Sequence, residues 1–111
     1  MKEIRAYIRP FKLEPLTMKL FEIPGFPGMS CTKCRGIGTE RKNQSSYEEH
    51  FDLFYDGLRI EIFAPDDLVE GIVSVLAKEA RTGLSGDGVI FILDVIEGIR
   101  ISSGERSAEL R

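Results

Sequence analysis

The strongest constraint on the fold is an order of elements that occurs twice along the chain. Residues 2–9 alternate between apolar and polar side chains, which is typical of a strand with one buried face. A segment with helical apolar spacing follows, and residues 29–38 return as a strand. The order then repeats, with a strand at 58–63, a helix from about Val69 and a strand at 89–95. Two consecutive strand–helix–strand halves predict a ferredoxin-like α+β fold, a split βαβ sandwich with helices on one face of an antiparallel sheet.

The last strand of this pattern suggests self-association. Six of the seven residues in 89–95 are apolar, so both faces of that strand are expected to be buried. A chain of 111 residues fits one domain over 1–111, and in so small a domain a second copy is the simplest cover. The polar segment 102–111 is expected to form a loose tail.

Charge and hydropathy exclude two classes of function. The net charge of −3 provides no basic surface of the kind that binds nucleic acid. No apolar run approaches the length of a membrane span, and the N-terminus alternates in charge and polarity, unlike a signal peptide. We therefore expect a cytoplasmic protein with two reduced cysteines.

Between the two halves, residues 39–56 show no clean period. Eighteen residues make a long connection in a compact domain, and such segments are more often functional or mobile than idle. We expect a protein partner to contact this segment.

Four segments carry a resemblance to a known family: MKEIRAYIRPFKL, GMSCTKCRGIG, RIEIFAPDDLVEGIV and TGLSGDGVIFILDV. Their order and spacing, from Met1 to about Glu105, resemble those of the P-II family of signalling proteins. The most specific piece is T-G-x-x-G-D-G-x-I-F at residues 82–91. The resemblance implies a homotrimer, clefts between subunits for ATP or ADP, and a protruding T-loop that docks on partners, here residues 39–56. It also implies a regulator, not an enzyme.

A nucleotide cleft needs a slot for the base, backbone donors for phosphate, and cations. Glycines permit the close approach of backbone to ligand because they lack a side chain. In any small sheet protein, however, glycines also end strands. The resemblance implies that these residues line or adjoin the cleft: Ser30, Gly36, Ile37, Gly38, Glu61, Phe63, Ala64, Gly86, Asp87, Gly88 and Arg100.

Several cations that the resemblance implies are replaced in this chain. Val89, Ser102 and Gly57 stand where the family has basic side chains, and Thr39-Glu40 replaces an arginine–glutamine pair. Each charge-assisted contact to an anion is worth about 1.5–3 kcal/mol, so the loss of several weakens a triphosphate site. We expect no usual 2-oxoglutarate sensing, no required cofactor, and weak ATP binding or a preference for ADP or AMP. Other basic residues can substitute: Arg9, Arg35, Arg41 and Lys42.

The cysteines and the single histidine offer an alternative metal site. In a regular strand, Cys31 and Cys34 point to opposite faces, so they do not share a metal, and Cys31 is expected in the core. His50 lies among carboxylates, which suits a divalent metal, but a solvated loop histidine is the simpler explanation. Tyr47 and Tyr55 are not expected to be modified.

Two alternatives to the main interpretation remain open. The main interpretation is a trimeric P-II-like regulator that controls a transporter or metabolic enzyme through residues 39–56. The first alternative is a metal-responsive P-II-like protein associated with metal efflux, and the second is a ligand-free trimeric scaffold. Catalysis is not expected, because no serine or cysteine has a credible histidine base.

Overall fold

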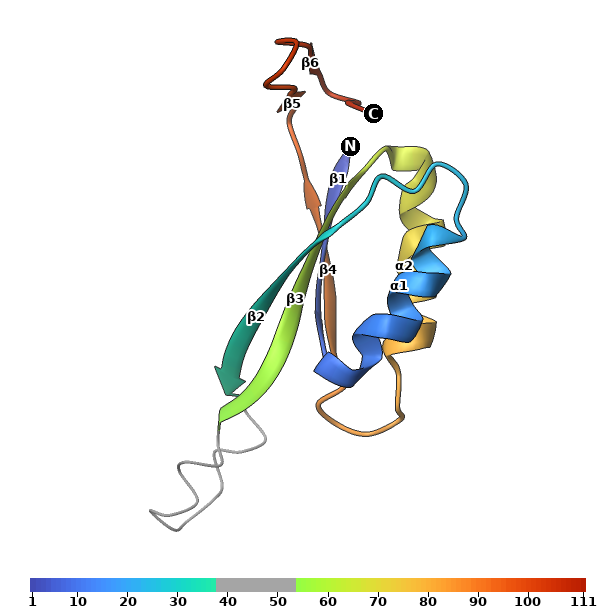
Figure 1. Cartoon of the computed structure of the whole chain (residues 1–111), viewed down its shortest axis with the longest axis vertical. Helices are drawn as coiled ribbons and strands as arrows, with labels where there is room; N and C mark the ends of the chain where they lie inside the picture. The colour runs from blue at the N-terminus through green and yellow to red at the C-terminus, as the bar shows by residue number, and fades with distance from the viewer. Residues whose placement is uncertain (38–53) are drawn as a thin grey trace.

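The computed structural model describes residues 1–37 and 54–111, and this part of the chain has the expected ferredoxin-like α+β fold (Figure 1). One sheet has the strand order β2-β3-β1-β4, and every neighbouring pair in it is antiparallel. Both helices lie on one face of this sheet. The elements are β1 (Lys2–Ile8), the 3-10 turn η1 (Pro10–Lys12), α1 (Leu13–Phe21), β2 (Ser30–Ile37), β3 (Phe54–Ala64), α2 (Asp66–Ala80), β4 (Gly88–Asp94), β5 (Gly98–Ile99) and β6 (Arg106–Ser107).

The core lies between the sheet and the helices, as the alternation in the sequence predicts. In the central strand β1, Ile4 lies between Ile62 of β3 and Ile92 of β4. The residue pairs of one face therefore meet the apolar stripes of the helices. The buried apolar cluster contains Ile4, Ala6, Ile8, Leu16, Leu20, Leu58, Ile60, Ile62, Ala64, Val69, Ile72, Leu76 and Ala80.

Strand β3 is longer than the sequence predicted. Residues 54–56, expected in the loop 39–56, belong to this strand. Its pairing with β1 stops at Ile8 and Leu58, whereas its pairing with β2 continues to Ile37 and Phe54. The β2–β3 ribbon therefore extends past the end of β1, as Figure 1 shows at the lower left. The rest of the predicted loop, together with Gly38, lies outside the described residues.

Within a single chain β4 is not buried on both faces, and its cover by a second copy stays a prediction. Val89 and Phe91 are 46% and 52% exposed, and they lie on the sheet face opposite the helices. Ile92, on the helix-facing side, is still 48% exposed because β4 is an edge strand. Cys31, expected in the core, is also exposed because it lies on the other edge strand, β2.

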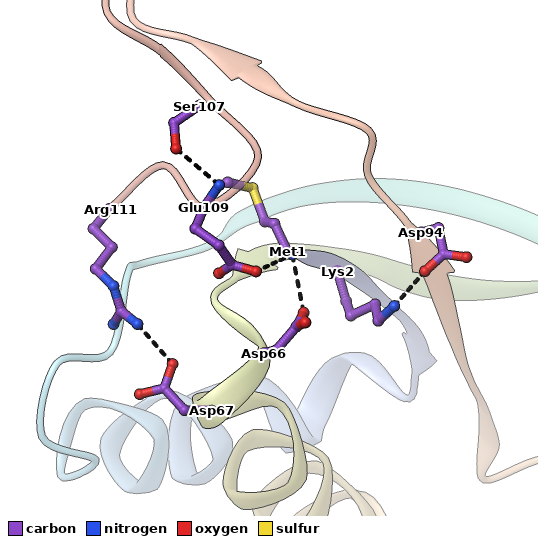
Figure 2. A network of polar contacts seen from close by, with 8 residues as sticks. All are labelled: Met1, Lys2, Asp66, Asp67, Asp94, Ser107, Glu109 and Arg111. Carbon is purple, nitrogen blue, oxygen red and sulfur yellow. Dashed lines mark hydrogen bonds and ion pairs between the residues drawn. The ribbon is translucent and has the colours of Figure 1, made fainter.

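The C-terminal segment is not the loose tail that its polarity suggested. Strands β5 and β6 pair with each other in a separate ribbon, and the last residues return to the start of β1 and α2 (Figure 2). The Met1 α-ammonium lies 2.6 Å from Glu109 Oε1 and 2.9 Å from Asp66 Oδ1. Arg111 donates to Asp67 Oδ1 at 2.8 Å. We call these five residues the terminal clasp. Charged side chains that were expected to be solvated therefore form ion pairs near the two chain ends.

None of the helices in the described residues is long and apolar enough to cross a membrane.

Candidate functional site

A groove of about 580 Å³ opens where the β2–β3 ribbon extends past the end of β1. Residues 7–9, at the end of β1, form its floor. Residues 34–37 and 56–57 of the ribbon form one wall. Residues 85–86 and 88–89, from the turn before β4 and its first residues, form the other. We call this the end groove. Its position follows from the strand register, because the ribbon and the turn continue beyond the last residue pair of β1.

Backbone makes up much of the groove wall, since four of its lining residues are glycines. At Gly88, φ is +117°, and a Cβ would lie 1.7 Å from the Tyr7 carbonyl oxygen. At Gly86, φ is +87°, and a Cβ would lie 3.2 Å from Arg9 Nη2. The resemblance implies that the backbone approaches a ligand closely at these glycines. At Gly88, the group that approaches is the chain's own backbone.

Asp87 organises the turn that forms this wall. Its carboxylate accepts hydrogen bonds from the backbone N–H of Thr82 at 2.7 Å and of Gly83 at 2.9 Å, and from the Thr82 hydroxyl. Arg9 Nε donates to it at 3.1 Å. These donors, the Thr82 hydroxyl above all, hold the pKa of Asp87 well below its usual range. Asp87 was expected at the cleft. Its carboxylate accepts hydrogen bonds from Thr82 and Gly83 of its own turn.

Two arginines line the end groove. Arg9 is tied to the turn, because Nη2 also donates to the Ser85 carbonyl at 2.8 Å. Arg35 lies on β2 opposite Asp56 of β3, and both residues line the groove. On the β4 wall, Val89 contributes an uncharged side chain. An arrangement of backbone, arginine and aliphatic surface suits a small anion that carries an apolar part.

One chain brings only part of the predicted cleft together. Gly36, Ile37, Gly86 and Gly88 line the end groove, and Asp87 adjoins it. Gly38 lies outside the described residues.

The other predicted cleft residues lie elsewhere. Ser30 pairs with Glu61 further along the sheet, and the side chain of Phe63 is 49% exposed on the same face. Ala64 is buried in the core. Arg100 follows β5 at the opposite end of the chain, where it donates to Glu105 Oε1 at 3.3 Å and to the Arg111 carbonyl. A single chain therefore does not form a site that uses both Arg100 and the end groove.

Sequence reasoning missed several lining residues: Tyr7, Ile8, Cys34, Asp56 and Ser85. No motif marks these positions, because they meet only through the register that makes β3 extend past β1. The signal available in the sequence was the acidic and aromatic run before residue 57, which was interpreted as part of the loop.

The described residues contain no group of three or more His, Cys, Asp or Glu side chains that could hold a metal ion. Cys31 is paired in register with Ile60 and Cys34 with Gly57, so the thiols point to opposite faces. Both are free, and partial desolvation of the exposed Cys31 thiol raises its pKa. His50 and Tyr47 lie outside the described residues, so the metal alternative at His50 stays a prediction.

Comparison with known proteins settles the family. The model of the family described as "Nitrogen regulatory protein P-II" matches residues 1–105. The chain belongs to the P-II family. Nitrogen regulatory protein P-II 1 of Escherichia coli (strain K12) is 40% identical over 95% of both chains. The P-II proteins of Klebsiella oxytoca and Haemophilus influenzae are 39% and 36% identical over 95% and 98% of both chains.

Membership in the P-II family confirms the resemblance and the fold that it implied. The family consists of nitrogen regulatory proteins, so the chain's role is in signalling. In this P-II protein the end groove lies at the base of residues 38–53. The chain enters this segment from residues 36–37 and leaves it through residues 54–57, and these residues belong to the β2–β3 ribbon beside the groove.

Proposed function

We propose that this P-II protein is a trimeric signalling protein whose end groove binds an adenine nucleotide or a related small anion. The observation that carries this proposal is the position of a glycine-walled, arginine-bearing groove at the base of residues 38–53. A ligand held there touches the ribbon from which that segment departs. Occupancy of the groove then biases the position of the segment, which contacts the partner.

The uncovered sheet face supports assembly from several copies. Phe63, Val89 and Phe91 are each about half exposed on this face within one chain. Phe91 packs edge-on against Tyr7, with ring centroids 6.4 Å apart. Burial of such apolar surface is worth about 25 cal/mol per Å² and favours association. Arg100 and the end groove, which lie at opposite ends of one chain, can then meet across a subunit seam.

The cation set supports an altered effector preference. The end groove has Val89, an uncharged residue, at the position that the resemblance assigns to a lysine. Gly57, likewise, lines the groove where a further basic side chain is implied. We infer weak ATP binding or a preference for ADP or AMP, with no usual response to 2-oxoglutarate. The partner is a transporter or metabolic enzyme in the cytoplasm, reached through residues 38–53.

Isothermal titration calorimetry tests this proposal directly. The protein is titrated with Mg–ATP, ADP and AMP, each with and without 2-oxoglutarate. We expect saturable binding of at least one adenine nucleotide, and the same dissociation constant for ATP whether or not 2-oxoglutarate is present. Cooperative, micromolar binding of ATP and 2-oxoglutarate would refute the altered preference. Absence of heat with all three nucleotides would refute nucleotide sensing and favour the scaffold alternative.

A further inference from the structure

The α-amino group of Met1 is held at the centre of the terminal clasp. The ammonium lies 2.6 Å from Glu109 Oε1 and 2.9 Å from Asp66 Oδ1, and the Met1 side chain is only 4% exposed (Figure 2). The Met1 carbonyl is also fixed, because it accepts a hydrogen bond from the Val95 N–H at 3.2 Å. One amine therefore joins the first residue of α2 to a residue that lies 108 positions from Met1.

The far side of this contact, Glu109, is tied to the C-terminal ribbon. Its backbone N–H donates to the hydroxyl of Ser107 in β6 at 2.9 Å. The next residue, Leu110, packs against Gly98 of β5, where an added Cβ would lie 3.0 Å from Leu110 Cδ2. A change at the Met1 amine can therefore reach both strands of the ribbon through Glu109 and Leu110.

Acylation of the amine removes what closes the clasp. An ammonium carries a positive charge and three N–H donors, whereas an N-acyl amide is neutral and keeps one N–H. The acyl group also needs space at the point where the two carboxylates converge. Asp66 and Glu109 would keep their like charges and lose the cation that they share.

We propose that the α-amino group of Met1 is a modification site whose state decides whether the C-terminal ribbon is held. A free amine closes the terminal clasp, and an N-acyl group leaves β5 and β6 without this contact. In the modification, the neutral amine attacks the carbonyl carbon of an acyl thioester. A C–N bond forms, the C–S bond breaks, and the thiol leaves with the proton that the amine loses. The site is independent of the end groove and of the ligand proposed for it.

The closed clasp protects the amine from acyl donors. Acylation needs a neutral and accessible amine. In the folded chain, Glu109 and then Asp66 raise the pKa of the amine, and Met1 is buried. Met1 is synthesised 108 residues before Glu109, so the amine is open to modification before the clasp can form. Folding then preserves whichever state the amine has.

Semisynthesis tests the proposal on the full chain, because Cys31 is a natural point for native chemical ligation. A synthetic thioester of residues 1–30 is joined to residues 31–111, with Met1 as the free amine, the N-acetyl form or the N-methyl form. N-methylation keeps the positive charge and two N–H donors, so this form is the matched control.

Hydrogen exchange at the Arg100 amide, which donates to the Glu105 carbonyl at 2.8 Å, reports on the ribbon. Exchange is expected to be about 3- to 10-fold faster in the N-acetyl form than in the free-amine form, because two ion pairs are lost. The N-methyl form is expected to exchange at the rate of the free-amine form. Equal rates in the N-acetyl and free-amine forms would overturn the proposal.

A second measurement decides the question if the N-acetyl chain does not fold. Recombinant wild type and Glu109→Gln react with N-hydroxysuccinimidyl acetate, and mass spectrometry follows acetylation of Met1. The exposed Lys78 of α2 is the internal reference. Met1 is expected to react severalfold faster in Glu109→Gln, while Lys78 reacts equally in both proteins. Equal rates at Met1 would show that the clasp does not guard the amine and would overturn the proposal.

Discussion

At the scale of single residues, Gly88 has no room for the Cβ of any other amino acid. A Cβ at this position would lie 1.7 Å from the Tyr7 carbonyl oxygen, and φ is +117°. Gly88→Ala is expected to lower the free energy of unfolding by about 2–4 kcal/mol, through backbone strain and displacement of β1. Chemical denaturation measures this change.

Gly71→Ala is the matched control for this substitution. Gly71 lies on the exposed face of α2, with nothing within 4 Å of an added Cβ. Alanine there is expected to stabilise the protein by about 0.5–1 kcal/mol, because it favours the helix. Equal stability of Gly88→Ala and the wild type would show that the turn and β1 are not packed as described.

Asp87 makes the stability of the turn depend on pH. Its folded-state pKa lies below its usual range, so its contribution is present above the ordinary carboxyl pKa and is lost as pH falls through the folded value. Asp87→Asn is expected to melt several degrees lower than the wild type at pH 7, and this difference in melting temperature is expected to become smaller in strong acid. Thermal melts over a range of pH measure the difference, with Glu70→Gln on the exposed face of α2 as control. A constant difference at every pH would contradict this assignment.

The residue scale also shows what the sequence can and cannot predict about the site. Gly36, Ile37, Gly86 and Gly88 were predicted from spacing and resemblance, and they line one groove. The bonds from Thr82 to Asp87 were not predictable, because hydrogen-bond direction depends on the folded turn. The predicted position of Cys31 was wrong because alternation assigns a face of the sheet but does not reveal an edge strand.

At the scale of elements, the stability of the terminal clasp depends on pH. The Met1 α-ammonium has its pKa raised by Glu109 first and then by Asp66, and the pKa of Asp66 is lowered in turn. The ammonium contributes at pH values below its unfolded pKa and loses this contribution as pH rises through the folded one. The carboxylate loses its contribution as pH falls. The clasp is therefore strongest near neutral pH.

The rate of amide hydrogen exchange in β5 and β6 measures how strongly the clasp holds this ribbon. Glu109→Gln combined with Arg111→Ala is expected to speed exchange in this ribbon severalfold at pH 7, and added salt is expected to act in the same direction. Glu22→Gln breaks the ion pair between Lys19 of α1 and Glu22, which directly follows the helix, and is expected to leave the ribbon unchanged. Exchange in the double variant at the wild-type rate would show that the ribbon is held by other contacts.

Elements were more predictable than their ends. Period-two and helical spacing predicted β1, part of β3, α1 and α2, because burial of one face imposes these periods. The extension of β3 by residues 54–56 was not predictable, since those residues gain strand geometry from pairing with β2. The tail was misjudged because its polar residues pair with charges far away in the sequence.

At the scale of the whole molecule, the proposed assembly of several copies depends on the sheet face that the helices leave uncovered. Phe91 of β4 is half exposed on this face, beside Tyr7 of β1. Phe91→Asp places a charge on this face and is expected to convert the proposed trimer into monomers, as measured by sedimentation equilibrium. Phe21→Asp, on the exposed face of α1, is the control and is expected to leave the mass unchanged. A Phe91→Asp protein with the wild-type mass would place the interface elsewhere.

The most direct test of the central claim follows backbone amide resonances during a titration with ADP. The account predicts saturable shifts at Gly36, Gly86 and Gly88, which line the end groove, and no shift at Gly71 on α2. Shifts confined to residues outside the groove, or none at saturating ADP, would contradict the assignment of this groove as the effector site.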